Sequence, residues 1–185
     1  MTAKPLRVGL IGVDTQGRGF GSKAHIPAIL AAPDVELTAV CTTKESSAKA
    51  AAEAFGAKRY HVGAAALLAD EEIDLVSIAV QVRSHYPLVW SALQAEKMVY
   101  CEWPLGLNAE EAQTLARQAE QRQLLSVVGT QGRFAPGIRY LKALIEDGFI
   151  GKPLFFRMSH LLPRFAVRSD HWWSAMEEEH SGALG

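Results

Sequence analysis

The chain has 185 residues, 49% of them hydrophobic, and a formal net charge of −1 at pH 7. This length and apolar content suffice for one full domain and part of another. The near-zero charge and the lack of a basic run argue against direct binding to nucleic acid or to an anionic membrane. Small neutral or anionic ligands fit this composition.

The first apolar run ends at Asp14, so it is too short for a secretory signal core or a membrane span. We therefore expect a cytoplasmic protein. The two cysteines, Cys41 and Cys101, each end a predicted strand, and neither cysteines nor histidines have metal-ligand spacing. The sequence thus predicts free thiols, buried or half-buried, and no metal site.

Apolar segments of strand length alternate with segments of helical period, the pattern of βαβ units around a parallel sheet. The strand segments are rich in valine, isoleucine and leucine without alternation, as in strands covered on both faces. The expected fold is therefore α/β, with a doubly wound parallel sheet. We expect strands over residues 6–13, 35–41, 75–80, 98–101 and 124–128, and a short one near Arg59.

Two helices have clear boundary signals. Asn108 and Glu111 form a capping-box-like start for a helix whose apolar face extends to Ala119. Another helix is expected from Pro136, with one apolar face, to a stop at Gly148.

The character of the chain changes after Gly151. Residues 154–162 predict one long strand, followed by a mixed segment up to Gly185. Because a single strand is not stable alone, we expect this stretch to begin a second domain that the chain contains only in part.

A glycine cluster surrounds the end of the first predicted strand, where backbone can approach a pyrophosphate and a helix N-terminus follows. Its members are Gly9, Gly12, Gly17, Gly19 and Gly21. The fingerprint G-x-G-x-x-G, laid from Gly12, meets Asp14 at its second glycine, and an aspartate there would repel a pyrophosphate. We therefore expect a longer loop that enters its helix near His25. The alternative is a merely flexible crossover. The residues expected to cradle the phosphates are Gly17, Arg18 and Gly19, with Arg18 or Lys23 supplying charge.

The second predicted strand ends at Thr42, Thr43 and Lys44, where an NAD-specific domain carries an acid for the ribose hydroxyls. No acid is present at these positions. Two hydroxyls and a lysine suit a 2′-phosphate, so the sequence predicts a preference for NADP over NAD. The alternative is that Thr43 only caps the helix that begins near Ser46, with Lys44 in solvent.

The crossover after residues 75–80 carries Val80, Gln81 and His85 into a helix, a placement that suits contacts to a cofactor's ribose and nicotinamide. A single histidine is more often structural than catalytic, and the same alternative holds for His25. Both histidines are nevertheless candidate cofactor-binding residues.

Glu102 and Trp103 follow the next strand, and Pro104 fixes them at the edge of the predicted site. The Glu102 carboxylate is expected to bind the cofactor ribose or the loop on its nicotinamide side. The Trp103 indole could stack near the nicotinamide or cover a substrate pocket, but it has no titratable proton for acid–base work. Arg133 could orient a substrate carboxyl or hold its own loop.

Glu102-Trp103-Pro104 resembles the Glu-Lys-Pro signature of the glucose-fructose oxidoreductase / inositol dehydrogenase / MocA family, with Trp103 at the position of the lysine. The resemblance extends from Val8 to about Gly185 and implies a Rossmann-type domain over residues 1–130. It implies that residues 131–185 begin a truncated second α/β domain, for substrate and oligomer contacts, and that the full-length form is a homo-oligomer. The family's lysine handles the proton of hydride transfer, and an indole cannot replace it.

Two functions are therefore expected as alternatives. One is an NADP- or NAD-dependent oxidoreductase of a sugar, polyol or related hydroxyl compound, with His85 or Tyr86 as proton donor. The other is a non-catalytic sensor that binds the dinucleotide and a protein partner, because the loops and Glu102-Trp103 look most like the branch of the fungal galactose-regulon repressor. Trp103 favours the sensor, whereas the family as a whole favours the enzyme.

Overall fold

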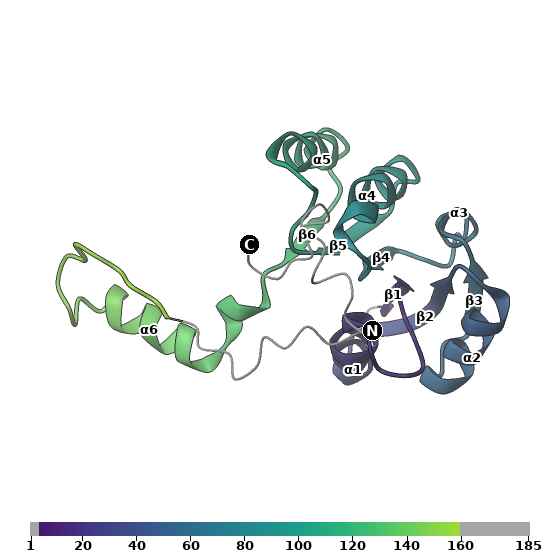
Figure 1. Ribbon diagram of the computed structural model, residues 1–185, viewed down its shortest axis with the longest axis horizontal. Helices are drawn as coiled ribbons and strands as arrows, with labels where there is room; N and C mark the ends of the chain where they lie inside the picture. Colours follow the sequence, from purple (N-terminus) through teal and green to yellow (C-terminus); the bar gives the residue numbers. More distant parts are fainter. Residues whose placement is uncertain (1–3, 160–185) are drawn as a thin grey trace.

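The computed structural model of the chain describes residues 4–159. Six parallel strands form one sheet in the order β3-β2-β1-β4-β5-β6, which confirms the doubly wound α/β fold (Figure 1). All predicted strands within this sheet are confirmed, including the short one near Arg59, with small shifts at their ends. Their bounds are Leu6–Ile11 (β1), Val35–Thr42 (β2), Arg59–Val62 (β3), Leu75–Ile78 (β4), Met98–Glu102 (β5) and Ser126–Gly129 (β6).

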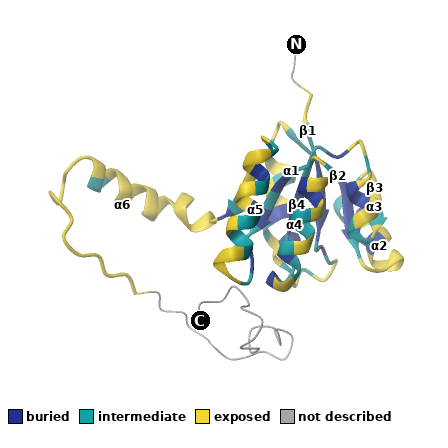
Figure 2. Ribbon diagram, turned by 90° about the horizontal axis from the view of Figure 1, so that it is seen from above, coloured by how far each residue is buried: buried dark blue, intermediate teal, exposed yellow. Residues whose placement is uncertain are grey.

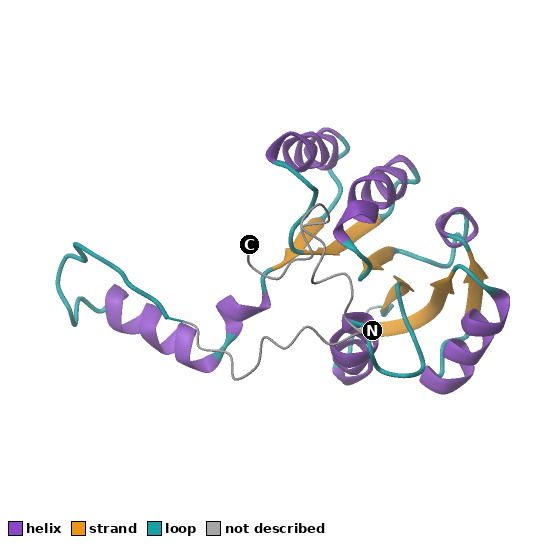
Figure 3. Ribbon diagram, in the orientation of Figure 1, coloured by secondary structure: helices purple, strands orange, loops and turns teal. Residues whose placement is uncertain are grey.

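Helices alternate with these strands along the described chain (Figure 3). A π-helical turn at Gly21–His25 leads directly into α1, and short 3-10 turns at Val82–Ser84 and Gln131–Phe134 follow β4 and β6. The α-helices are Ile26–Ala31 (α1), Glu45–Phe55 (α2), Ala64–Leu68 (α3), His85–Gln94 (α4), Ala109–Gln121 (α5) and Pro136–Glu146 (α6).

Two apolar clusters, one on each face of the sheet, hold these layers together. Helices α3, α4 and α5 cover one face, where Ile78, Leu93 and Leu115 are buried. Helices α1 and α2 cover part of the other face, over Leu10 and Val40. Burial of both faces explains why the strands read as continuous apolar runs. Cys41 and Cys101 are buried free thiols, as predicted.

The predicted helix boundaries at residues 108 and 148 are confirmed. The Asn108 side chain accepts a 2.9 Å hydrogen bond from the backbone N–H of Glu111, and the Glu111 carboxylate in turn accepts the N–H of Leu107 at 2.8 Å. Gly148 has a φ of +73°, the left-handed conformation that favours glycine after a helix.

Helix α6 lies apart from the sheet and its covering helices, and none of its residues is buried (Figure 2). The expected strand at 154–162 is wrong for its described part, because residues 154–159 form no strand. A strand is stable only when a neighbour accepts its hydrogen bonds, and the described residues offer this segment no such neighbour. Residues 160–162 and the tail 181–185 lie outside the described residues.

Candidate functional site

The carboxyl ends of the parallel strands meet at one edge of the sheet, where open α/β sheets bind ligands. The strand order changes direction at β1, which pairs with β2 on one side and with β4 on the other. The loops after β1, β4, β5 and β6 carry Gly12, Val80, Trp103 and Arg133 respectively. The fold therefore brings these predicted site residues to the same edge.

Gly12 and Gly21 set the course of the first loop. Gly12 has a φ of +95°, and a side chain there would collide with the backbone oxygen of Ala79. A side chain on Gly21 would collide with the carbonyl oxygen of Gly12. These glycines provide the tight turn and the close helix–strand contact of a dinucleotide fingerprint, but with a longer insertion between them.

Helix α1 begins at Ile26, as expected for a loop that enters its helix near His25, but a π-helical turn precedes it from Gly21. The reason is local: without a side chain, Gly21 passes directly against Gly12, and the π-helical turn that starts there continues into α1. Sequence reasoning noted Gly21 in the glycine cluster but missed this contact. The signal was that Gly21 lies immediately before a segment that continues into the helix without a break.

The Asp14 side chain holds the first loop together through hydrogen bonds to its backbone. Its carboxylate accepts backbone N–H bonds from Gln16 at 2.9 Å, Arg18 at 3.1 Å and Gly19 at 2.8 Å. Burial raises the pKa of Asp14, but these three bonds and the Arg18 charge outweigh it, so the pKa lies below its usual value. The predicted phosphate cradle of Gly17, Arg18 and Gly19 therefore needs a correction, because Asp14 already occupies two of its amides.

Ser22 fastens this loop to the helical turn. Its buried hydroxyl donates to the backbone oxygen of Asp14 at 2.6 Å and accepts from the Asp14 N–H at 2.9 Å. The loop is thus an internally bonded structure, unlike the flexible crossover considered as the alternative.

At the end of β2, Thr42 makes the local hydrogen bonds that were considered for Thr43. The Thr42 hydroxyl lies 2.9 Å from the backbone oxygen of Lys44 and 2.7 Å from the hydroxyl of Ser47. Lys44 is the N-cap residue of α2, and no side chain caps that helix. Thr43 and Lys44 are both exposed at this edge of the sheet.

A chain of polar contacts links β4, the π-helical turn before α1, and β5 beneath the carboxyl edge of the sheet. The two ring nitrogens of His25 lie 2.7 Å from the Ser77 hydroxyl and 2.8 Å from a carboxylate oxygen of Glu102. The side-chain amide of Gln131 donates to both Glu102 oxygens, at 2.8 and 2.7 Å. The rings of Phe20 and Tyr100 meet His25 edge-on.

Glu102 also lines an open cleft of about 470 Å³ at the ends of β5 and β6. Trp103 forms part of its wall with half of its surface exposed (51%), next to the cis peptide bond that joins it to Pro104. The guanidinium of Arg133 lies 5.5 Å from the ring centre of Phe134. The other lining residues are Phe20, Gly129, Thr130, Gln131 and Gly132.

His85 and Tyr86 lie elsewhere. His85 is buried, and its ring nitrogens lie 2.7 Å from the carbonyl oxygen of Pro104 and 3.0 Å from that of Val80. Tyr86 stacks on Trp90 at 6.1 Å between ring centres. Neither side chain lines the Glu102 cleft, and the contacts of His85 are those of a residue that fixes two loops. Gln81 precedes the 3-10 turn that leads to His85.

Four residues of this site escaped sequence reasoning: Phe20, Ser77, Tyr100 and Gln131. Ser77 gave the clearest signal, because it is a polar residue in the middle of a buried apolar strand. A buried hydroxyl needs a hydrogen-bond partner, and here that partner is His25.

Among residues 4–159, no three acidic, histidine or cysteine side chains are grouped so as to hold a metal ion. The same part of the chain has no helix with the length and apolarity needed to cross a membrane.

The comparisons with known proteins identify the family. Residues 6–130 match the model of an oxidoreductase family described by its NAD-binding Rossmann fold, the Gfo/Idh/MocA family. The chain belongs to this family. The resemblance carried by Glu102-Trp103-Pro104 is thereby confirmed.

Curated relatives include both enzymes and a regulator. The chain is 33% identical to dehydrogenase aclE of Aspergillus oryzae over 82% of its own length and 43% of the relative's. It is 32% identical to a D-apiose dehydrogenase of Paraburkholderia graminis (85% and 41%), and 31% identical to the galactose/lactose metabolism regulatory protein GAL80 of Saccharomyces cerevisiae (80% and 36%). The chain thus spans less than half the length of these relatives.

Solved structures show the same range. KijD10, a 3-ketoreductase from Actinomadura kijaniata in complex with TDP-benzene and NADP, matches with a TM-score of 0.72 at 30% identity, over 80% of this chain and 46% of that one. A super-repressor mutant of Gal80p from Saccharomyces cerevisiae matches with a TM-score of 0.73 at 29% identity, over 80% and 40%.

Proposed function

We propose that this chain binds a nicotinamide dinucleotide across the carboxyl edge of the sheet and serves hydride transfer to or from a sugar, polyol or related hydroxyl compound. The observation that carries the proposal is the passage of Gly21 against Gly12 at the junction of β1 and β4. This crossing places a helical turn over the point where the strand order reverses, the usual position of a dinucleotide.

The residues along the edge fit the two ends of such a cofactor. Thr43 and Lys44 offer a hydroxyl and a positive charge at the end of β2, and Phe20 and Trp103 offer aromatic surface in the cleft after β5. A bound dinucleotide would supply the two-electron acceptor for a hydride from a carbinol carbon. The chain supplies the binding, the orientation and the proton chemistry.

Lys44 is the proposed selector of NADP over NAD, since it is the exposed cation at the end of β2. Substitution Lys44→Ala is expected to weaken NADP binding about tenfold, roughly the 1.4 kcal/mol of one charge-assisted contact, and to leave NAD binding unchanged. Calorimetric titration with each dinucleotide measures this. Lys58→Ala, a lysine paired with Glu36 at 2.8 Å, is the matched control.

Equal losses of NADP and NAD affinity in Lys44→Ala would contradict the role of Lys44 as selector. The proposal that the chain binds a dinucleotide would still stand. No heat with either dinucleotide in the unmodified chain would contradict the proposed function itself.

A second candidate function is that of a non-catalytic sensor, which one observation favours: Trp103 stands at the lysine position with 51% of its surface exposed in the cleft. Such a sensor passes dinucleotide occupancy to a protein partner. An exposed indole at the mouth of the cleft suits a contact surface as well as it suits a substrate wall.

Trp103→Lys in the full-length protein distinguishes the two functions. Dehydrogenase turnover that appears only in the variant indicates a site that has lost its enzymatic lysine, as the sensor requires. Turnover in the unmodified chain contradicts a purely sensory role. The reduction of NADP, followed by absorbance with myo-inositol as substrate, measures both. Tyr140→Lys, at an exposed position of α6, controls for the added charge.

We also propose the division of the chain into a dinucleotide-binding domain over residues 1–130 and the start of a second domain over 131–185. Helix α6 supports this division, because it follows β6 yet packs on neither face of the sheet. The second domain is the proposed site of substrate contacts and of homo-oligomer formation.

A further inference from the structure

The Glu102 carboxylate lines the cleft and is hydrogen-bonded by two side chains, His25 and Gln131. His25 contacts its Oε1 at 2.8 Å, and the Gln131 amide contacts Oε1 at 2.8 Å and Oε2 at 2.7 Å. The Glu102 side chain is 16% exposed and the His25 side chain 6%. Glu102 therefore faces the cleft, whereas His25 is buried behind it.

A carboxylate has about four acceptor positions, two on each oxygen. His25 and Gln131 occupy both positions of Oε1, and Gln131 occupies one of Oε2. One acceptor position on Oε2 is left in a group that lines the cleft. A hydroxyl group in the cleft could donate to it.

For a neutral His25 ring, the hydrogen-bond inventory also gives a direction to its two contacts. A neutral imidazole has one N–H, and only an N–H on Nε2 can donate to the Glu102 carboxylate, which has no proton to offer when ionised. Nδ1 is then the acceptor for the Ser77 hydroxyl at 2.7 Å. Ser77, His25 and Glu102 thus form one hydrogen-bond chain, in which the buried Ser77 hydroxyl and the His25 ring hold the Glu102 carboxylate in place.

The other ionisable groups near this pair do not compete for the proton. Burial raises the pKa of the Tyr100 hydroxyl, and the Glu102 charge raises it further. Burial and the same charge raise the pKa of the Cys101 thiol to about 12. The Arg133 guanidinium is the cation that lines the cleft, and Phe20 and Trp103 contribute side chains without a titratable group.

We propose that Glu102 is the acid–base residue of this site, in place of the lysine that Trp103 has replaced, and that His25 is its positioning residue. This inference rests on the proposed oxidoreductase function. It assigns the proton step to a group that lines the cleft, whereas His85, the candidate expected from sequence, is buried against two carbonyl oxygens.

The step balances in the direction of oxidation. The substrate O–H bond breaks and its proton goes to Oε2 of Glu102. The electron pair left on oxygen forms the C=O bond as the C–H bond breaks, and the hydride leaves for the two-electron acceptor named above. The proton then returns to solvent through the open side of the cleft, and reduction follows the reverse order.

Glu102→Gln tests the assignment, since it keeps the shape and the acceptor oxygen but removes the base. With NADP and either myo-inositol or D-apiose as probe, we expect kcat to fall on the order of 100-fold or more and its acid limb to disappear. Calorimetric titration of the variant with NADP separates a loss of cofactor binding from the loss of kcat. Glu36→Gln, which removes a remote carboxylate from β2, should change none of these quantities.

His25→Gln tests the positioning role. We expect a smaller loss of kcat, an unchanged KM and a displaced pH profile, which a merely structural loss would not produce. A readout independent of turnover is the nitrogen NMR of the His25 ring: the proton should be on Nε2 in the unmodified chain and should redistribute between the nitrogens in Glu102→Gln.

Two results would overturn the inference and leave the proposed function standing. One is turnover of Glu102→Gln within threefold of the unmodified chain with the same pH profile. The other is a His25 ring whose only proton is on Nδ1. If the full-length protein binds NADP but oxidises neither probe, the oxidoreductase function fails and the acid–base role fails with it.

Discussion

At the residue scale, the loop at the carboxyl edge depends on two kinds of position. At some a side chain would collide with backbone, and at others a side chain accepts several backbone hydrogen bonds. Gly12 and Gly21 allow two backbone segments to pass in contact, and Asp14 gathers the amides of the intervening loop. The usual fingerprint reaches the same geometry with a shorter turn. The longer loop between Gly12 and Gly21 is therefore held by the Asp14 carboxylate, and the close contact of Gly12 with Gly21 is kept.

Gly21→Ala should destabilise the chain, because its Cβ would meet the backbone oxygen of Gly12, which cannot move freely. The expected loss is about 1–3 kcal/mol of unfolding free energy, measured by urea denaturation, together with weaker dinucleotide binding. Gly137→Ala in α6, where an added Cβ meets no atom, should cause no loss. Equal stability of the two variants would contradict the close crossing.

At the scale of elements, helices α5 and α6 show that the same sequence signals lead to different degrees of packing. Both have a recognisable start and an apolar stripe. In α5 the stripe includes Leu115 and Ala119, which are buried against the sheet, whereas α6 buries none of its residues. A cap and a stripe thus predict a helix, but not the surface on which it packs.

Asn108→Ala should remove the acceptor for the Glu111 N–H at the start of α5 and lower the unfolding free energy by about 1 kcal/mol. Asn108→Ser keeps a side-chain oxygen at this position and should retain most of the stability. Thermal or urea unfolding of both variants measures the difference. A loss in Asn108→Ser as large as that in Asn108→Ala would show that the cap does not account for it.

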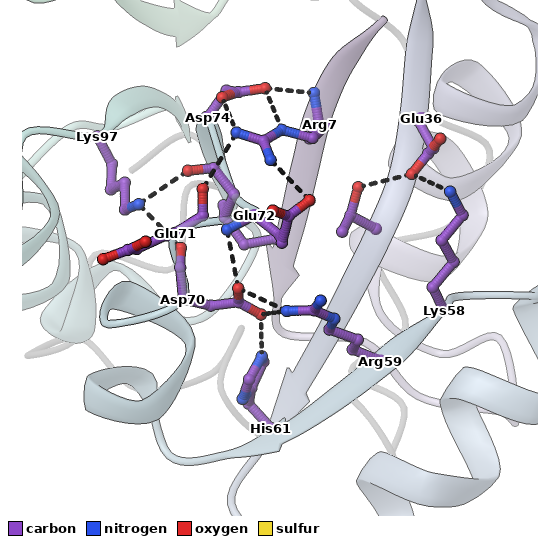
Figure 4. A network of polar contacts seen from close by, with 12 residues as sticks. Arg7, Glu36, Lys58, Arg59, His61, Asp70, Glu71, Glu72, Asp74 and Lys97 are labelled. Carbon is purple, nitrogen blue, oxygen red and sulfur yellow. Dashed lines mark hydrogen bonds and ion pairs between the residues drawn. The ribbon is translucent and has the colours of Figure 1, made fainter.

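At the scale of the whole molecule, charge pairs at the opposite edge of the sheet join distant parts of the chain (Figure 4). The Arg7 guanidinium binds both carboxylate oxygens of Asp74, at 2.9 and 2.6 Å. Asp70 holds Arg59 at 2.8 Å and His61 at 2.9 Å. These contacts lie away from the candidate site, so changes here should affect stability rather than ligand binding.

Asp74 makes the stability dependent on pH. The hydrogen bond from Arg7 lowers the pKa of Asp74 from 3.8 to about 2, and burial opposes this only in part. Because the folded-state pKa is the lower one, the stabilisation is complete above about pH 4 and is lost as pH falls toward 2. Asp74→Asn should therefore be less stable than the unmodified chain at pH 7, with a difference that shrinks over this interval.

Urea midpoints of the two proteins between pH 7 and pH 2 measure this difference. Asp34→Asn, an exposed aspartate outside the network of Figure 4, is the control and should follow the unmodified chain throughout. A difference for Asp74→Asn that stays constant with pH would contradict the role of its charge.

The sequence by itself determined the strands, their order of appearance, the capped start of α5 and the family. Each of these depends on local composition or on neighbours a few residues away, such as Asn108 with Glu111. Only the tertiary structure decided that Ser77, His25 and Glu102 form one contact chain, that Gly21 meets Gly12, and that α6 stands apart. The contacts of His25 with Ser77 and Glu102 join residues far apart in the chain. The order of the strands and the course of the loops set these partners, and no local sequence pattern encodes them.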